Sequence, residues 1–247
     1  GSAGWRMVNI LISGYYGFDN IGDESILRTL VSSLREHIPD CSLTVLSHNP
    51  ASTREKYGVE AVDRMSPMAI LRAVKKCDML ISGGGSLLQD VTSSKSLHYY
   101  LSIIRCAEFF HKKVFIYSQG IGPIDRPGNR RAAAAALKRA DGIVVRDERS
   151  ASLLEEIGIA RDKVVITADP VIRMKKPDGD VGAEILRKAG VSLDGRLTVG
   201  WAIRERDTDS RFVKELLRSI QMMKDKYNAQ SVLIPFHYEE DGEVCRH

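Results

Sequence analysis

The sequence has no apolar run of about 18 residues, the length that a helix needs to span a bilayer. It also has few cysteines, with no C-x-x-C pair and no histidine at zinc-finger spacing from any of them. They are Cys41, Cys77, Cys106 and Cys245. We therefore expect no disulfide framework, no metal site and a cytoplasmic location. The net charge of +4 is small for 247 residues, and because basic and acidic residues are interleaved it does not indicate a nucleic-acid partner.

Short apolar segments alternate with amphipathic ones, which is typical of a parallel α/β sheet. Strands are predicted at 8–13, 43–46, 79–81, 114–117, 143–145 and 164–166. The segment 173–182 has glycines, a proline and little periodicity, as a linker would, and the alternation then resumes with strands at 197–202 and 232–236. The predicted organisation is a cloning-tag remnant at 1–6, a doubly wound domain at 7–172, a linker at 173–182 and a second Rossmann-like domain at 183–247.

Only two strands of this second domain precede the end of the sequence. A complete doubly wound domain needs several more. We therefore expect the second domain to be incomplete and this chain alone to have little or no activity.

A glycine-containing motif, residues 14–23, follows the first strand and opens a helix, where open α/β sheets bind ligands. Its glycines are not spaced as G-x-G-x-x-G, and the acids at the helix start would repel a pyrophosphate. Aromatic rings, an amide and a carboxylate suit a sugar better. The predicted sugar contacts are Tyr15, Tyr16, Asn20 and Asp23. The alternative is a tight turn that binds nothing.

A second motif, residues 83–93, follows another strand. Gly84 and Gly85 would bring bare backbone amides close to a ligand, and Gln89 and Ser93 would add hydrogen-bonding groups. Asp90 is a candidate general base for a sugar hydroxyl. The alternative is that Asp90 and Ser93 only cap the next helix.

Two further strands end in polar motifs, SQGIGP at 118–123 and VRDERS at 145–150. Gln119 and Arg146 are candidates for the same acceptor site. Gln119 could instead belong to a structural turn. For the second motif the simpler interpretation is favoured: Asp147 caps a helix and Arg146 holds that helix by an ion pair.

In the second domain, Arg204 and His237 each follow a predicted strand. If these strands are parallel, both side chains lie at carboxyl ends that face the cleft between the domains, so both are candidate donor-binding groups. For Arg204, the planar guanidinium also suits a carboxylate or a phosphate. Alternatively, Arg204 forms a surface ion pair and His237 has no chemical role.

Together these blocks resemble the polysaccharide pyruvyltransferase family. The residues that carry the resemblance are GYYGFDNIGDESIL at 14–27, GGGSLLQDVTSSKSLHYY at 83–100, SQGIGP, VRDERS, and ADP at 168–170. The resemblance implies a GT-B-like fold and transfer of a pyruvate ketal from phosphoenolpyruvate, with no other cofactor. It also implies a donor-binding role for Arg204. The family's later Arg-Leu-His segment, whose histidine is expected to act as general acid, has no counterpart before His247.

For the most similar members, the resemblance further implies an acceptor and a place in the cell. The acceptor is an N-acetylmannosamine in a lipid-linked disaccharide, modified at O4 and O6 in the cytoplasm, with peripheral membrane contact through the lipid. Two other classes stay open from the residues alone. One is a GT-B-type glycosyltransferase that uses a nucleotide-sugar, and the other is a non-catalytic carbohydrate-binding protein.

Overall fold

The computed structural model describes residues 7–174, 176, 179–203 and 210–235. The chain divides into two compact units, Gly1–Met174 and Lys175–His247. We describe each unit by itself.

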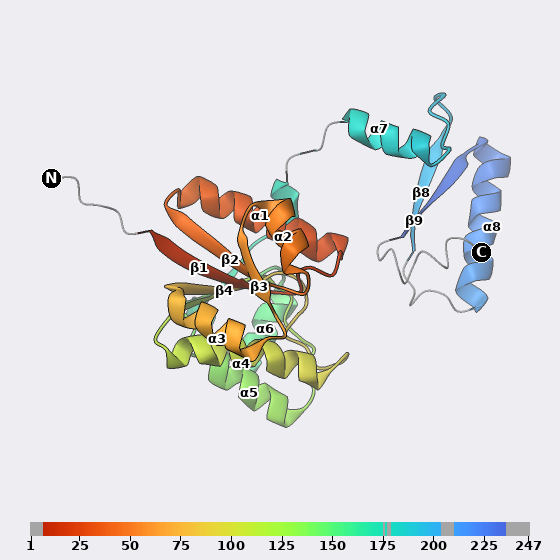
Figure 1. Ribbon diagram of the computed structural model, residues 1–247. Coiled ribbons are helices and arrows are strands. Elements are labelled where there is room, and N and C mark those ends of the chain that lie inside the picture. The colour runs from red at the N-terminus through yellow and green to blue at the C-terminus, as the bar shows by residue number, and fades with distance from the viewer. Residues whose placement is uncertain (1–6, 175, 177–178, 204–209, 236–247) are drawn as a thin grey trace. The chain divides into compact units, whose positions relative to one another are not determined.

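A seven-stranded, all-parallel sheet forms the centre of the first unit (Figure 1). The strand order is β3-β2-β1-β4-β5-β6-β7, so the direction of winding reverses between β1 and β4. The strands are β1 (Val8–Ser13), β2 (Cys41–Ser47), β3 (Glu60–Asp63), β4 (Met79–Gly83), β5 (Lys113–Gln119), β6 (Gly142–Val145) and β7 (Val164–Ile166). The prediction of a doubly wound parallel sheet is confirmed.

Helices cover both faces of this sheet, with α1 and α2 on one face and α3 to α6 on the other (Figure 1). The helices are α1 (Ile21–His37), α2 (Pro50–Tyr57), α3 (Pro67–Lys76), α4 (Ser94–Phe109), α5 (Pro127–Leu137) and α6 (Glu148–Glu156), with short 3-10 turns η1 (Arg161–Lys163) and η2 (Pro170–Arg173). Two apolar clusters result, one on each face. Ile10 and Ile12 of β1 belong to the α1 side, whereas Leu11 belongs to the α4 side, as the alternation of side chains along a strand requires.

Local sequence signals explain where these helices begin. Asn20, Asn49, Ser66 and Asp147 each accept a hydrogen bond from a backbone N–H in the first turn that follows. Prolines occupy the first helical position of α2, α3 and α5, where no N–H donor is needed. The predicted capping role of Asp147 is confirmed, with Ser150 N donating at 2.7 Å.

The described part of the second unit contains α7 (Gly179–Lys188), β8 (Thr198–Ile203), α8 (Ser210–Tyr227) and β9 (Gln230–Pro235). Strands β8 and β9 pair in parallel. Helix α7 starts at Gly179, so the predicted linker at 173–182 is wrong at its end. The reason is that the polar and glycine-containing start of this helix has too little periodicity to distinguish it from a loop.

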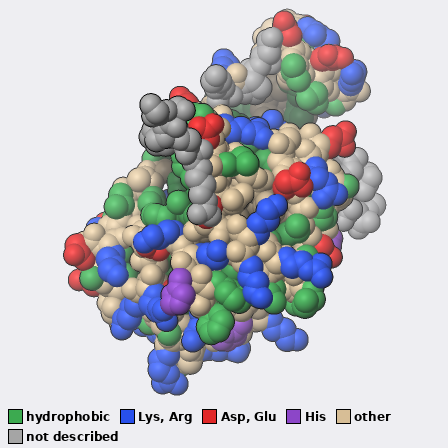
Figure 2. All heavy atoms as spheres, turned by 60° about the vertical axis from the view of Figure 1, so that its left-hand side comes forward, with side chains coloured by type: hydrophobic (Ala, Val, Ile, Leu, Met, Phe, Trp, Pro, Cys, Tyr) green, Lys and Arg blue, Asp and Glu red, His purple; other side chains and the backbone are tan. Residues whose placement is uncertain are grey.

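The sequence reasoning also missed β3, a short strand at the sheet edge that begins with an exposed glutamate. Among the described residues, no helix combines the length and apolar character that crossing a membrane requires. On the face shown in Figure 2, lysine and arginine side chains lie in separate groups over the surface.

Candidate functional site

Two loops meet at the point where the sheet reverses its winding direction. The β1–α1 loop and the loop after β4 leave adjacent strands at their carboxyl ends, which is where open α/β sheets bind ligands. The hydroxyl of Tyr16 in the first loop donates to the carbonyl oxygen of Gly83 at 2.9 Å. The two motifs that the sequence predicted to converge therefore do so.

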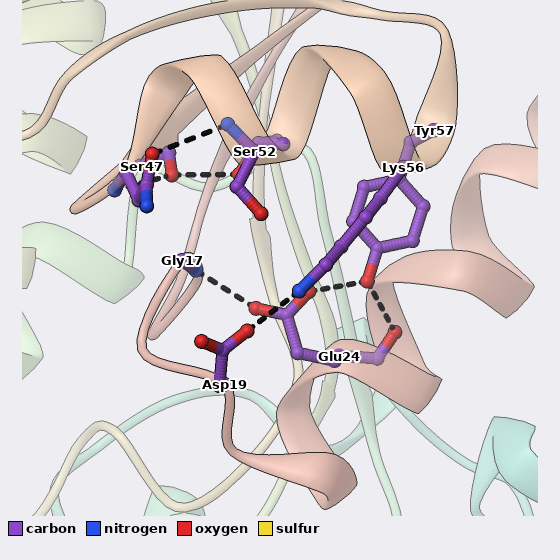
Figure 3. A network of polar contacts seen from close by, with 9 residues as sticks. Gly17, Asp19, Glu24, Ser47, Ser52, Lys56 and Tyr57 are labelled. Carbon is purple, nitrogen blue, oxygen red and sulfur yellow. Dashed lines mark hydrogen bonds and ion pairs between the residues drawn. The ribbon is translucent and has the colours of Figure 1, made fainter.

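A hydrogen-bonded network fixes the β1–α1 loop against α2 (Figure 3). Glu24 of α1 points between the loop and α2, accepting from the backbone N–H of Gly17 at 2.8 Å and from the hydroxyl of Tyr57. Beside it, Lys56 of α2 forms an ion pair of 2.6 Å with Asp19. Because Glu24 is used in this way, it supports the loop and is not a free carboxylate for a ligand.

Asp23 lies over the glycine loop of β4. A Cβ added to Gly85 would stand 2.5 Å from Asp23 Oδ1, and Gly85 has a φ of +70°. Glycine is therefore needed at this position for both space and backbone conformation. Burial, reinforced by the negative charge of Glu24 and opposed by Arg146, raises the pKa of Asp23 to about 6. A carboxyl group with this pKa can exchange protons near neutral pH.

Arg146 follows β6 and joins three strand ends. Its Nη1 forms an ion pair of 3.2 Å with Asp169, after β7, and its Nη2 donates to Ser86 Oγ, after β4, at 2.9 Å. A Cβ on Gly120, after β5, would stand 2.9 Å from Arg146 Nη2. The expected ion pair of Arg146 thus exists, but it joins β7 and does not hold the following helix.

Asp90 does not have the environment of a general base. Its carboxylate accepts from the backbone N–H of Asp125 at 2.9 Å, from that of Arg126 at 3.0 Å, and from Asn129 Nδ2 at 2.8 Å. Burial alone would raise the pKa of Asp90, but these three hydrogen bonds outweigh it and lower the pKa. These contacts favour a structural role over the predicted role as base, and the N-cap position of α4 belongs to Ser93 and not to Asp90. Asp90 instead fixes the loop that enters α5.

Three other residues predicted to contact the sugar are buried inside the first unit, which argues against direct contact with a ligand. Tyr16 is fully buried, so its ring packs in the core. Gln119 is fully buried too; its amide nitrogen donates to Ser82 Oγ at 2.9 Å, and its amide oxygen has no hydrogen-bond partner among the described residues. The N–H of Gly84 donates to the carbonyl oxygen of Tyr117 at 2.9 Å, and its Cα packs against Ile26.

The remaining acceptor-side candidates lie in the two loops. The side-chain oxygen of Asn20 caps α1 by accepting from Gly22 N and Asp23 N. The amide of Gln89 is bonded to Thr92 within its own loop. Ser93 occupies the N-cap position of α4 without making a side-chain cap bond, and Tyr15 is partly exposed.

Arg204 and His237 lie outside the described residues. Among the residues that are described, no group of three or more His, Cys, Asp or Glu side chains could hold a metal ion. Sequence reasoning missed Arg64, Phe18 and His48, which gather with Tyr15 at the ends of β1, β2 and β3. The signal was weak because Arg64 follows the edge strand that the pattern did not reveal.

A comparison with protein-family models gives a family match, and a comparison with solved structures gives the fold. A family model described as polysaccharide pyruvyl transferase matches residues 20–247. The amylovoran biosynthesis protein AmsJ of Erwinia amylovora is 24% identical over 239 residues, an alignment that covers 80% of this chain. The chain spans only 57% of the length of that relative.

Among solved structures, UDP-GlcNAc 2-epimerase from Methanocaldococcus jannaschii has a TM-score of 0.60 at 13% identity, over 96% of this chain and 68% of that one. The enzyme of the same name from Neisseria meningitidis has a TM-score of 0.59 at 14% identity, over 96% and 70%. At these identities the likeness shows the fold alone, an α/β GT-B-like fold.

Proposed function

Since the chain belongs to the polysaccharide pyruvyl transferase family, we propose that it transfers a pyruvyl group from phosphoenolpyruvate to two hydroxyls of a sugar, forming a ketal. The observation that carries this proposal is the family match over residues 20–247. The similarity to AmsJ, a protein of amylovoran biosynthesis, supports a polysaccharide product.

The proposed reaction begins with protonation of the methylene carbon of phosphoenolpyruvate by a general acid, which makes the adjacent carbon cationic. A sugar hydroxyl attacks that carbon and loses its proton to a base. The bond from the same carbon to the phosphate oxygen then breaks, and phosphate leaves with the bonding electron pair. The second hydroxyl attacks and loses its proton, which closes the ketal and leaves phosphate as the other product.

We assign the base to Asp23. Its pKa of about 6 leaves it mostly ionised at neutral pH and able to accept a proton from a hydroxyl in the transition state. It also lies above the open backbone of Gly85, at the carboxyl end of the sheet. Asp90, by contrast, already accepts three hydrogen bonds and has a lowered pKa.

On the acceptor side we further propose contacts to Tyr15, Asn20, Gln89, Ser93 and Arg146. The proposed acceptor is an N-acetylmannosamine in a lipid-linked disaccharide, modified at O4 and O6, which would bring the protein to the inner face of the membrane. On the donor side we propose Arg204 and His237, where a guanidinium would pair with the carboxylate or phosphate of phosphoenolpyruvate.

The test is a comparison of two donors with the full-length protein and an aryl-linked or lipid-linked acceptor. We expect acceptor-dependent phosphate release from phosphoenolpyruvate, together with an acid-labile pyruvyl group on the product. No nucleotide should be released from nucleotide-sugars. Nucleotide release without phosphate release would identify a glycosyltransferase, and release of neither would leave a carbohydrate-binding protein.

A further inference from the structure

Arg64 is a buried cation at the end of β3. The residue is 7% exposed, and its backbone N–H donates to the carbonyl oxygen of Ser47 at 3.0 Å. Its guanidinium carbon lies 4.6 Å from the ring centre of Tyr99, 5.0 Å from that of Phe18, and 5.6 and 5.8 Å from those of Tyr100 and Tyr15. Rings at these distances stabilise a cation through their electron-rich faces.

No carboxylate compensates this charge within the part of the chain that the structure describes, where none of the ion pairs involves Arg64. Its Nη2 donates to the hydroxyl oxygen of Tyr100 at 3.2 Å, and its buried Nε has no hydrogen-bond partner. Burial acts to lower the pKa of Arg64, but Tyr100 and Tyr99 outweigh it and raise the pKa, so the group stays charged. A buried charge that lacks an opposite charge is costly to the fold.

Beside Arg64 stands a column of three parallel rings. The ring centres of Tyr15 and Phe18 are 4.0 Å apart, and those of Phe18 and His48 are 4.4 Å apart, with 6° between the ring planes in both pairs. Tyr15 packs against the core, whereas His48 is exposed and forms the outer end. Flat ring faces of this kind pack against the apolar faces of sugar rings.

We propose that these six residues form an aromatic–arginine cage that binds a saccharide carrying an anionic group, with the sugar ring against the aromatic column and the anion paired with Arg64. The cage consists of Tyr15, Phe18, His48, Arg64, Tyr99 and Tyr100. The anion is a carboxylate of the sugar or a glycosyl phosphate. The inference rests on the proposed function for its choice of a saccharide, since the cage would hold the acceptor.

The position of the cage fits the acceptor side of the site. The cage and the proposed base share the carboxyl end of the sheet, since Tyr15 and Phe18 lie in the β1–α1 loop and Asp23 lies in the first turn of α1. A sugar unit held by the cage would therefore neighbour the unit whose hydroxyls react. On this account, Arg64 sets acceptor specificity and is a binding residue without a part in proton transfer.

The experiment measures binding by the unchanged chain without phosphoenolpyruvate, so that its outcome does not depend on pyruvyl transfer. The ligands are glucuronate, N-acetylglucosamine 1-phosphate and neutral N-acetylglucosamine. We expect one or both anionic sugars to bind and the neutral sugar to bind at least tenfold more weakly, roughly the effect of one charged hydrogen bond. Binding of glucuronate alone would identify a carboxylate as the partner of Arg64. Binding of N-acetylglucosamine 1-phosphate alone would identify a phosphate. Equal binding of all three, or binding of none, would overturn the proposal.

Three variants locate the binding. Arg64→Met should weaken anionic-sugar binding by about tenfold to a hundredfold. Its melting temperature should be unchanged or higher, because an apolar side chain removes an uncompensated buried charge. His48→Ala should weaken binding by about threefold to tenfold, the scale of one lost aromatic contact. Arg105→Met, which removes an exposed arginine of α4, is the matched control and should change nothing.

Two results decide between a binding role and a structural role. Unchanged binding in Arg64→Met, with the fold intact, would overturn the proposal. If that variant melts much earlier, His48→Ala decides the question, because the exposed His48 can be removed without disturbing the core. Weakened binding in that variant then supports the cage, and unchanged binding refutes it.

Discussion

Replacing Asp23 by Asn should make the protein more stable at neutral pH while it removes most of the proposed activity. Asp23 is partly buried in the first turn of α1, where burial and the charge of Glu24 raise its pKa to about 6. Asparagine has almost the same shape and no charge, so the cost of holding an ionised carboxylate in this place disappears. If Asp23 is the base, turnover should fall roughly a hundredfold or more.

The magnitude follows from the pKa. A rise from 3.8 to about 6 corresponds to about 3 kcal/mol of unfolding free energy at pH 7. Against this gain, the variant loses the favourable interaction of an acid with the start of the helix dipole, about 0.3–1 kcal/mol. The attraction between Asp23 and Arg146 is already contained in the net pKa of Asp23 and is not subtracted again. We therefore expect a net gain of about 2–3 kcal/mol, several degrees in Tm for a unit of this size.

The gain should depend on pH in a defined direction. Because the folded-state pKa is raised, the protonated carboxyl group carries no penalty, and the two proteins should be about equally stable near pH 4. The penalty on the unchanged protein develops as the pH rises from about 4 to about 6 and is constant above that. The assay is urea unfolding at about pH 4 and about pH 7.5, together with phosphate release by the full-length protein.

The matched control is Asp19→Asn, the same chemical change at an exposed carboxylate that pairs with Lys56. It should change the unfolding free energy by less than about 1 kcal/mol at either pH. A loss of stability in Asp23→Asn at neutral pH, or a gain that is the same at both pH values, would refute the burial argument. Undiminished turnover would remove Asp23 as the base.

Three further substitutions test the remaining assignments. Asp90→Asn should lower the unfolding free energy by about 1.5–3 kcal/mol, because an amide replaces a charged acceptor of three hydrogen bonds. The kcat per folded molecule should stay nearly constant. A large fall in kcat without loss of stability would restore Asp90 as a catalytic group. Gly85→Ala should lower the unfolding free energy by about 1 kcal/mol or more, measured by urea unfolding, and should also displace Asp23. Activity should therefore fall well beyond the loss of folded protein. Normal activity would show that Asp23 need not lie over this loop. Arg204→Lys should raise the KM for phosphoenolpyruvate about tenfold with an unchanged thermal melt, whereas an unchanged KM would make Arg204 a surface residue.

The sequence predicted the architecture of the first unit well, because the relevant signals are local. Apolar runs such as residues 8–13 and the helix stripe of Ile26, Leu27, Leu30 and Val31 follow from side-chain periodicity alone. Asp147 was correctly predicted to cap a helix, since an N-cap acts on the turn that follows it. The edge strand β3 was missed because it is short and half exposed.

The candidate site was predicted only in outline. The sequence placed the loops after β1, β4, β5 and β6 at one end of the sheet, since parallel strands present their carboxyl ends at the same edge. It could not tell which polar groups are already satisfied there. Asp90 and Asn129 are 39 residues apart, and nothing near Asp90 in the sequence indicates that bond.

The sequence by itself therefore determined the doubly wound sheet apart from its edge strand β3, and the motifs at its carboxyl end, since these depend on periodicity and on capping between near neighbours. Only the tertiary structure decided the chemistry of each side chain. Packing buried Tyr16 and Gln119, saturated the carboxylate of Asp90, and placed Asp23 over Gly85 with a raised pKa. The physical reason is that burial and hydrogen-bond partners set the pKa and accessibility of a polar group, and both are supplied by segments distant in the chain.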